Sequence, residues 1–209
     1  MPRHIVRIRF FAVMIMAFMW ASVDLSAQTL PPAEEILSER ILGNSDAKVT
    51  MIEYASMTCP HCANFHTKTF PAIKKEYIVT GKIKFIYRDF PLDQFALAAA
   101  MMARCSAKER YFGVVDVIFR TQREWGRNPN PRKALEQIGK IVGVSENTYE
   151  ACVTDKVVHD GIMKMRNDAV EKYKVRTTPT FVVNEKKING GLPLEELRKV
   201  LDAAVAKAS

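Results

Sequence analysis

The sequence contains few cysteines, few glycines and, after residue 21, no long apolar run. Its 209 residues include 4 cysteines, 9 glycines and 10 prolines, and they contain no internal repeat. Hydrophobic residues make up 48% and charged residues 26%, a balance that excludes a disordered, collagen-like or low-complexity chain. No segment beyond residue 21 is long and apolar enough to span a membrane. We therefore expect a folded protein with a sizeable core.

Basic residues exceed acidic ones, 31 to 23, and the formal net charge is +8. An excess of this sign is compatible with nucleic-acid binding, but the basic residues are spread along the chain, and the run Glu185–Lys187 mixes both signs. A solvated surface explains this pattern better than a nucleic-acid site does. We therefore expect no nucleic-acid partner.

The first 27 residues have the layout of an export signal. Arg3, Arg7 and Arg9 precede the apolar stretch 10–21, and small and polar residues follow as far as Ala27. As a helix, that stretch would span about 18 Å, well short of the roughly 30 Å hydrocarbon core of a bilayer. Cleavage near Ala27 and release into the periplasm are therefore favoured over the alternative, a retained membrane anchor.

The remaining pattern predicts an α/β protein. A strand at 49–55, a helix from Cys59 to about residue 78 with a kink at Pro71, and a strand at 83–87 form a βαβ unit. Helices are expected at 93–107, 109–122, 131–142, 146–153 and 156–173, with a loop at 123–130. Strands at 180–183 and 187–190 and an amphipathic helix from Pro193 complete the chain, while residues 28–47 are expected to be an extended lead-in.

Cys59-Pro60-His61-Cys62 lies where the first strand passes into its helix. Free N–H groups and the helix dipole favour an anion there, and Pro60 suits the first helical position. Cys59 should therefore be the exposed, acidic nucleophile, and Cys62 the more buried resolving thiol. His61 adds a nearby donor or positive charge that favours the thiolate. This arrangement predicts thiol–disulfide exchange.

The tetrapeptide has three alternative interpretations besides exchange. Attachment of a c-type haem is excluded because Ala63, not histidine, follows Cys62. A zinc or copper site using Cys59, Cys62 and His66 stays open, although no second Cys/His pair lies nearby in the sequence. A purely structural disulfide also stays open, although so small a ring would be strained and easily reduced.

Two residues elsewhere strengthen the redox interpretation. If the Thr178–Pro179 bond is cis, the backbone there can lie beside the sulfurs and pair with an extended substrate; the alternative is a trans proline that merely begins a strand. Glu53, a carboxylate within an apolar strand, could accept or relay the proton of Cys62. The alternative for Glu53 is a solvated or salt-bridged position.

The export signal, the run from Ile52 to Cys62, the inserted helices and the Thr177–Pro179 segment together resemble the DsbA-type thiol:disulfide oxidoreductases of the thioredoxin superfamily. The resemblance covers nearly all of the chain beyond the signal. It implies a strongly acidic Cys59, a cis Pro179 beside the active site and a buried acid at Glu53. It also implies donation of disulfides to newly exported proteins, with reoxidation by a quinone-linked membrane partner of the DsbB type. We expect no cofactor and no bound metal.

The expected fold is therefore a thioredoxin fold with an inserted helical domain. After the signal peptide at 1–27, the thioredoxin-like part should comprise residues 28–91 and 174–209, and the insertion residues 92–173. Residues 28–58 are too few to hold an N-terminal dimerisation domain, which favours a monomer and oxidation over isomerisation. The alternatives are an isomerase or reductase of the same fold, or a periplasmic metal-binding or chaperone-like protein.

Cys105 and Cys152 both fall on expected helices of the insertion. A structural disulfide between these helices is the preferred interpretation, because export leads to an oxidising compartment. Two buried free thiols are the alternative. His66 and His159 are expected to be partly exposed surface groups on helices.

Overall fold

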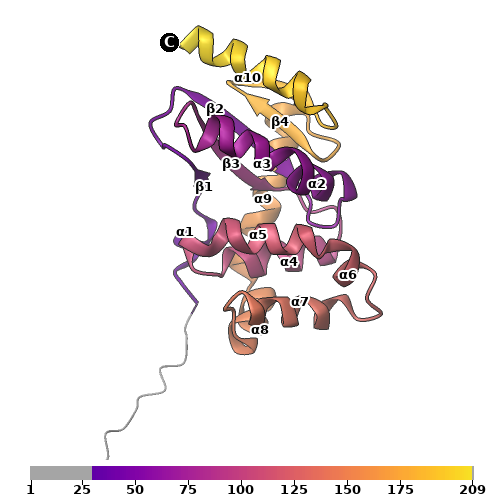
Figure 1. Ribbon diagram of the computed structural model, residues 1–209. Coiled ribbons are helices and arrows are strands. Elements are labelled where there is room, and N and C mark those ends of the chain that lie inside the picture. Colours follow the sequence, from indigo (N-terminus) through magenta and orange to yellow (C-terminus); the bar gives the residue numbers. More distant parts are fainter. Residues whose placement is uncertain (1–29, 209) are drawn as a thin grey trace, which may run out of the picture.

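Five strands form one mixed sheet in the computed structural model, which describes residues 30–208 (Figure 1). Their order across the sheet is β1 (Arg40–Leu42), β3 (Ile83–Asp89), β2 (Val49–Ala55), β4 (Thr180–Val183) and β5 (Lys186–Asn189). β2 and β3 are parallel, and the other neighbouring strands are antiparallel. The expected signal peptide at 1–27 lies outside the described residues.

Helices cover both faces of the sheet, so β2 is buried on both sides, as its apolar run predicts. One face packs against a long helical stretch made of α2 (Pro60–Asn64), α3 (Phe70–Ile73) and two π-helical segments, Phe65–Thr69 and Lys74–Ile78. α10 (Leu194–Ala208) packs on the same face. The helix thus continues past Pro71, and wide π turns lie on either side of the short α3 that contains this proline.

A block of helices lies between β3 and β4, as expected, and packs beside the sheet (Figure 1). It consists of α4 (Gln94–Arg104), a 3₁₀ turn (Lys108–Arg110), α5 (Tyr111–Arg120), α6 (Gln122–Gly126), α7 (Pro131–Ile141), α8 (Glu146–Thr154) and α9 (Lys156–Tyr173). Asp93, Asn130, Ser145 and Asp155 cap the starts of α4, α7, α8 and α9 with side-chain oxygens. Within residues 30–208, every helix is too short or too polar to span a bilayer.

The predicted extended lead-in at 28–47 is wrong, because this segment contains α1 (Ala33–Leu37) and the edge strand β1. The buried guanidinium groups of Arg40 and Arg104 hold it in place: both donate to the carbonyl oxygen of Ile36, at 3.1 Å. Arg104 also pairs with the buried Asp89 at the end of β3. A partner 68 residues away in the sequence therefore decides this local structure.

The loop expected at 123–130 is also partly wrong, because its first half belongs to α6. Trp125 explains the difference. Its ring is buried, and its indole N–H donates to the carbonyl oxygen of Ile118 at 2.9 Å. Packing of this aromatic side chain extends helical structure towards Gly126, where composition alone favours a loop.

Candidate active site

Cys59 occupies the junction between β2 and α2. The turn after Ala55 is closed by a hydrogen bond from the N–H of Cys59 to the carbonyl oxygen of Ser56, at 3.1 Å. Cys59 is the N-cap residue of α2, with extended backbone angles, and Pro60 takes the first helical position. The Cys59 sulfur therefore lies at the end of the helix where free N–H groups and the positive end of the dipole favour an anion.

The two sulfurs of the tetrapeptide differ in exposure and in acidity. Cys59 is 6% exposed and Cys62 fully buried, so Cys59 is the more accessible, though less open than the expected exposed thiol. A hydrogen bond from Cys62 is the largest effect on Cys59, and the N–H groups of Cys62 and His61 add to it. Against the opposing effect of burial, they lower the pKa of Cys59 to about 5.

The pKa of Cys62 is shifted in the opposite direction. Burial, followed by its hydrogen bond to Cys59 and the negative charge of Glu53, raises its pKa far above the ordinary thiol range. At neutral pH, Cys59 is therefore a thiolate in all but roughly one molecule in a hundred, whereas Cys62 keeps its proton. The roles expected for the pair, a nucleophile and a resolving thiol, match this difference.

His61 favours the Cys59 thiolate through its backbone, whereas the sequence predicts a contribution from its side chain. Its imidazole is exposed, and the interaction that favours the Cys59 thiolate comes from its main-chain N–H. The local helix geometry, more than the histidine ring, therefore supplies this part of the stabilisation.

The Thr178–Pro179 peptide bond is cis and lies next to the nucleophile. When Cys59 is protonated, its thiol donates to the Thr178 carbonyl oxygen at 3.3 Å. Gly190, which the sequence analysis did not single out, permits this arrangement. A Cβ atom at Gly190 would lie 1.8 Å from the carbonyl oxygen of Pro179, so only glycine fits beside the cis-proline.

Glu53 is fully buried and pairs with His66. β2 side chains alternate between the two faces of the sheet, and Glu53 shares the face of Met51 and Ala55 that packs against the Cys62 helix. The carboxylate Oε2 lies 2.8 Å from His66 Nε2. The expectation that His66 is a surface group is therefore wrong: this side chain is 3% exposed, because it fills the space between the helix and the sheet.

His66 is consequently turned towards Glu53, which occupies its Nε2. This pairing weakens the hypothesis of a metal site formed by Cys59, Cys62 and His66. In the part of the chain that the structure describes, no group of three or more histidine, cysteine or acidic side chains is arranged to hold a metal ion. His159, by contrast, is exposed as expected and pairs with Asp160.

Gln122, at the start of α6, is a second residue that sequence analysis missed. Its buried side-chain amide donates to the carbonyl oxygens of Met57 and Cys59, at 2.8 and 2.9 Å. It thereby joins the helical block to the turn that carries the nucleophile. A glutamine in a helix has no sequence signal for such a role, because both acceptors are main-chain atoms more than 60 residues away.

Replacing Gln122 by alanine is expected to lower the free energy of unfolding by about 1–2 kcal/mol, because buried carbonyl groups lose a donor. Urea denaturation measures the change. Gln137→Ala, at an exposed position in α7, is the matched control and should change stability far less. Equal effects of the two substitutions would show that the Gln122 hydrogen bonds do not stabilise this turn.

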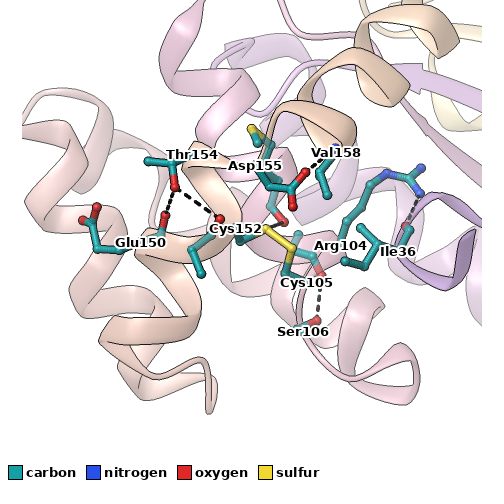
Figure 2. Close-up of a disulfide and its surroundings, with 12 residues drawn as sticks. Ile36, Arg104, Cys105, Ser106, Glu150, Cys152, Thr154, Asp155 and Val158 are labelled. Atoms are coloured by element: carbon teal, nitrogen blue, oxygen red, sulfur yellow. Dashed lines mark hydrogen bonds between the residues drawn. A yellow bond between two sulfur atoms is a disulfide. The ribbon is translucent and has the colours of Figure 1, made fainter. Parts of the chain in front are cut away.

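Cys105 and Cys152 form a disulfide in the helical block (Figure 2). Cys105 caps the C-terminal end of α4, Cys152 lies in α8, and their Cα atoms are 6.2 Å apart. Both are buried in a small apolar cluster with Ile36 and Ile162, and Figure 2 shows Arg104 reaching from the same end of α4 to Ile36. The bond thus links two helices at a distance from the Cys59–Cys62 pair in the chain.

Two cysteines at the start of a helix, beside a cis-proline on a mixed sheet, define a site for dithiol–disulfide exchange. A family model described as Thioredoxin matches residues 36–203. The chain belongs to this thioredoxin family and, within it, to the DsbA-type proteins. The expected fold class, a thioredoxin fold with helices inserted between the two parts of the sheet, is confirmed.

Individual relatives agree with this assignment. The crystal structure of alpha-DsbA1 from Wolbachia pipientis is similar with a TM-score of 0.77 and 33% identity, covering 82% of this chain and 92% of that one. A protein of Rickettsia bellii, provisionally named protein-disulfide oxidoreductase, is 34% identical over 148 residues, which is 70% of this chain. This chain spans only 57% of the Rickettsia protein. Disulfide bond formation protein D of Bacillus subtilis is 25% identical over 80% of this chain and 77% of its own length.

Proposed function

We propose that this protein introduces disulfide bonds into newly exported proteins by thiol–disulfide exchange at Cys59 and Cys62. The observation that supports this direction is the contrast between the two sulfurs: the pKa of Cys59 is about 5, whereas burial raises that of Cys62. Cys59 is thereby the better leaving group, and the reduced protein is stabilised by its thiolate. Loss of the protein's own disulfide is consequently favourable.

The exchange takes place in two displacement steps. A substrate thiolate attacks the Cys59 sulfur of the Cys59–Cys62 disulfide, and Cys62 leaves as a thiolate that takes up a proton. A second substrate thiolate then attacks the substrate sulfur of the mixed disulfide, and Cys59 leaves as a stable thiolate. The substrate has lost two electrons and gained one disulfide, and the protein now holds two reduced cysteines.

The size of the effect supports an oxidase rather than a reductase. A thiol whose pKa is about 5 instead of 9.0 stabilises the reduced form at pH 7 by about 3 kcal/mol. For a two-electron couple this corresponds to roughly 60 mV in the oxidising direction. A Cys59 thiol with an ordinary pKa would not shift the reduction potential of the Cys59–Cys62 pair in this direction.

The backbone at Thr178 and Pro179 is the proposed substrate contact. The Thr178 carbonyl lies beside the Cys59 sulfur, so a chain bound there in extended form would bring its own cysteine to the nucleophile. Main-chain pairing depends little on side chains, which suits substrates of varied sequence. Glu53, fully buried on the face of β2 that packs against the Cys62 helix, is the proposed acceptor and donor of the Cys62 proton.

The partners and location follow from the same proposal. Reduced exported proteins are the substrates, and a quinone-linked membrane protein of the DsbB type restores the Cys59–Cys62 disulfide. The charged and apolar layout of residues 3–27 supports export to the periplasm. We also propose that the protein acts as a monomer, with the signal peptide, insertion and sheet parts divided as the sequence predicts.

Three measurements test this proposal: a thiolate titration, the accumulation of mixed disulfides and the redox potential of the Cys59–Cys62 pair. Thiolate absorbance of the reduced protein should titrate with a midpoint near pH 5 that Cys59→Ser abolishes. Cys62→Ser should accumulate mixed disulfides with reduced, unfolded substrates, whereas Cys59→Ser should not. Equilibration with glutathione should show an oxidising couple. A Cys59 midpoint near pH 8 would contradict the oxidase function, and rescue of a scrambled-disulfide substrate without added oxidant would identify an isomerase instead.

A further inference from the structure

Glu53 and His66 extend the active site away from the face that carries Cys59. Glu53 Oε2 lies 2.8 Å from His66 Nε2. Its other oxygen, Oε1, is buried and has no hydrogen-bond partner among the residues that the structure describes. Glu53 lies on the same face of β2 as Met51 and Ala55, which pack in one buried cluster with Cys62, and its negative charge contributes to the raised pKa of the Cys62 thiol. Glu53 is thus in hydrogen-bond contact with His66 and on the face of the sheet against which the Cys62 helix packs.

His66 also lines a cavity of about 460 Å³ between the helical stretch 60–78 and α5. This cavity is open to solvent, and its wall includes the charged side chains of Lys74, Lys75, Asp116 and Arg120. Neither Cys59 nor the cis-proline contributes to it. His66 therefore has the buried carboxylate on one side and a route to water on the other.

The remaining surroundings of His66 hold the ring in place and are mostly apolar. Phe119 of α5 stacks on it with ring centroids 4.2 Å apart, and Phe65 and Phe70 pack against it from its own helical stretch. Tyr87 of β3 meets it edge-on, and burial raises the pKa of this phenol well above its ordinary value, so Tyr87 stays neutral. Glu53 is the one ionisable partner that hydrogen-bonds the ring within the described residues.

We propose that His66 carries the proton of Cys62 between Glu53 and the cavity, so that the buried thiol exchanges protons with solvent from the side that substrate does not cover. This inference rests on the proposed exchange at Cys59 and Cys62 and adds a positioning residue to it. It solves a problem that burial creates: Cys62 is fully buried, and a substrate bound at Thr178 would cover the Cys59 face.

The proton balance can be followed during formation of the Cys59–Cys62 disulfide. The Cys62 thiol gives its proton to the Glu53 carboxylate, and the carboxylic acid passes a proton to the neutral imidazole of His66. The imidazolium then releases a proton to water in the cavity. The Cys62 thiolate attacks the Cys59 sulfur of a mixed disulfide, the new bond forms, and the other thiol leaves as a thiolate. Reduction of the disulfide runs the same transfers in reverse.

The resolving step isolates this transfer. Reduced protein is converted to the mixed disulfide between Cys59 and glutathione, and release of glutathione by Cys62 is followed in a single turnover between pH 4.5 and 8. His66→Gln, which keeps a hydrogen-bond donor for Glu53, should slow this step roughly a hundredfold at pH 7, the lower end of general acid–base contributions. His66→Phe, which keeps the packing with Phe119, should slow it equally.

The matched control is His159→Gln, which removes an exposed histidine paired with Asp160 and should leave the rate unchanged. A second measurement uses His66→Ala, in which added imidazole should restore part of the rate by entering the cavity. A purely structural role would not produce this rescue. For any variant that does not fold, the ring nitrogen signals of His66 in the wild-type protein replace the rate, and they should change between the dithiol and disulfide forms.

The outcomes separate this inference from the proposed function. Rates and pH profiles of His66→Gln and His66→Phe that match the wild type, without an imidazole effect, would overturn the proton route while leaving exchange at Cys59 intact. Identical ring nitrogen signals in the two redox forms would overturn it too. A wild-type protein that forms no mixed disulfide, or whose Cys59 titrates near pH 8, would instead contradict the proposed function itself.

Discussion

Replacing both Cys105 and Cys152 by alanine is expected to lower the free energy of unfolding by roughly 4 kcal/mol. The disulfide joins residues 47 positions apart, and its removal frees that length of chain in the unfolded state. The two sulfurs are buried beside Ile36 and Ile162, so their loss also removes packing contacts from an apolar cluster. The helices that they join, α4 and α8, should be the first part of the protein to open.

Urea denaturation of the oxidised wild type and of the C105A/C152A variant measures this difference. Thiolate titration of the variant is the control, because Cys59 belongs to a different part of the structure and should still titrate near pH 5. A stability loss below about 1 kcal/mol would show that packing alone holds the helical block together.

The thiolate of Cys59 is expected to contribute about 3 kcal/mol to the stability of the reduced protein at pH 7. The pKa of this thiol is about 5 in the folded protein and close to 9.0 in an unfolded chain. A group whose pKa is lower in the folded state stabilises the fold fully above the unfolded value. The contribution falls as the pH drops from about 9 and is lost once the pH is below about 5.

Other groups also titrate between these pH values, so the comparison requires a variant that lacks only the thiolate. Reduced wild type and reduced Cys59→Ser are unfolded with urea at pH 7 and pH 4, and the change with pH in the wild type should exceed that in the variant by about 3 kcal/mol. Equal pH dependence in the two proteins would show that the folded protein does not stabilise the Cys59 thiolate. Oxidised wild type should lack this excess over reduced Cys59→Ser, because a Cys59–Cys62 disulfide does not titrate.

Some parts of this structure follow directly from local patterns. The strand at 49–55, the helix at 156–173 and the strand at 180–183 lie where the sequence predicts them. Each has a continuous apolar run or a periodic apolar face bounded by turn or capping residues. The position of Cys59 and Pro60 between strand and helix also follows from the local sequence, since it depends only on where β2 ends and which residue begins α2.

The wrong predictions share a different cause. α1 and β1 are held by Arg104, far along the chain, and α6 is extended by the burial of Trp125. His66 has the spacing of an ordinary helical surface residue, and only the packing of the helix onto the sheet buries it. No local pattern can indicate these features, because the contact that decides each of them is made by another element.

The sequence by itself determined the chemistry of this protein: a pair of cysteines at a helix start, a Thr-Pro before a late strand and an acid within an apolar strand. These are local features, and the helix dipole and the conformation of proline act on them over a few bonds. Only the tertiary structure decided the environment of that chemistry. Glu53 meets His66, Gln122 reaches the carbonyl of Cys59, and Gly190 makes room for Pro179, because folding brings together residues that the chain keeps apart.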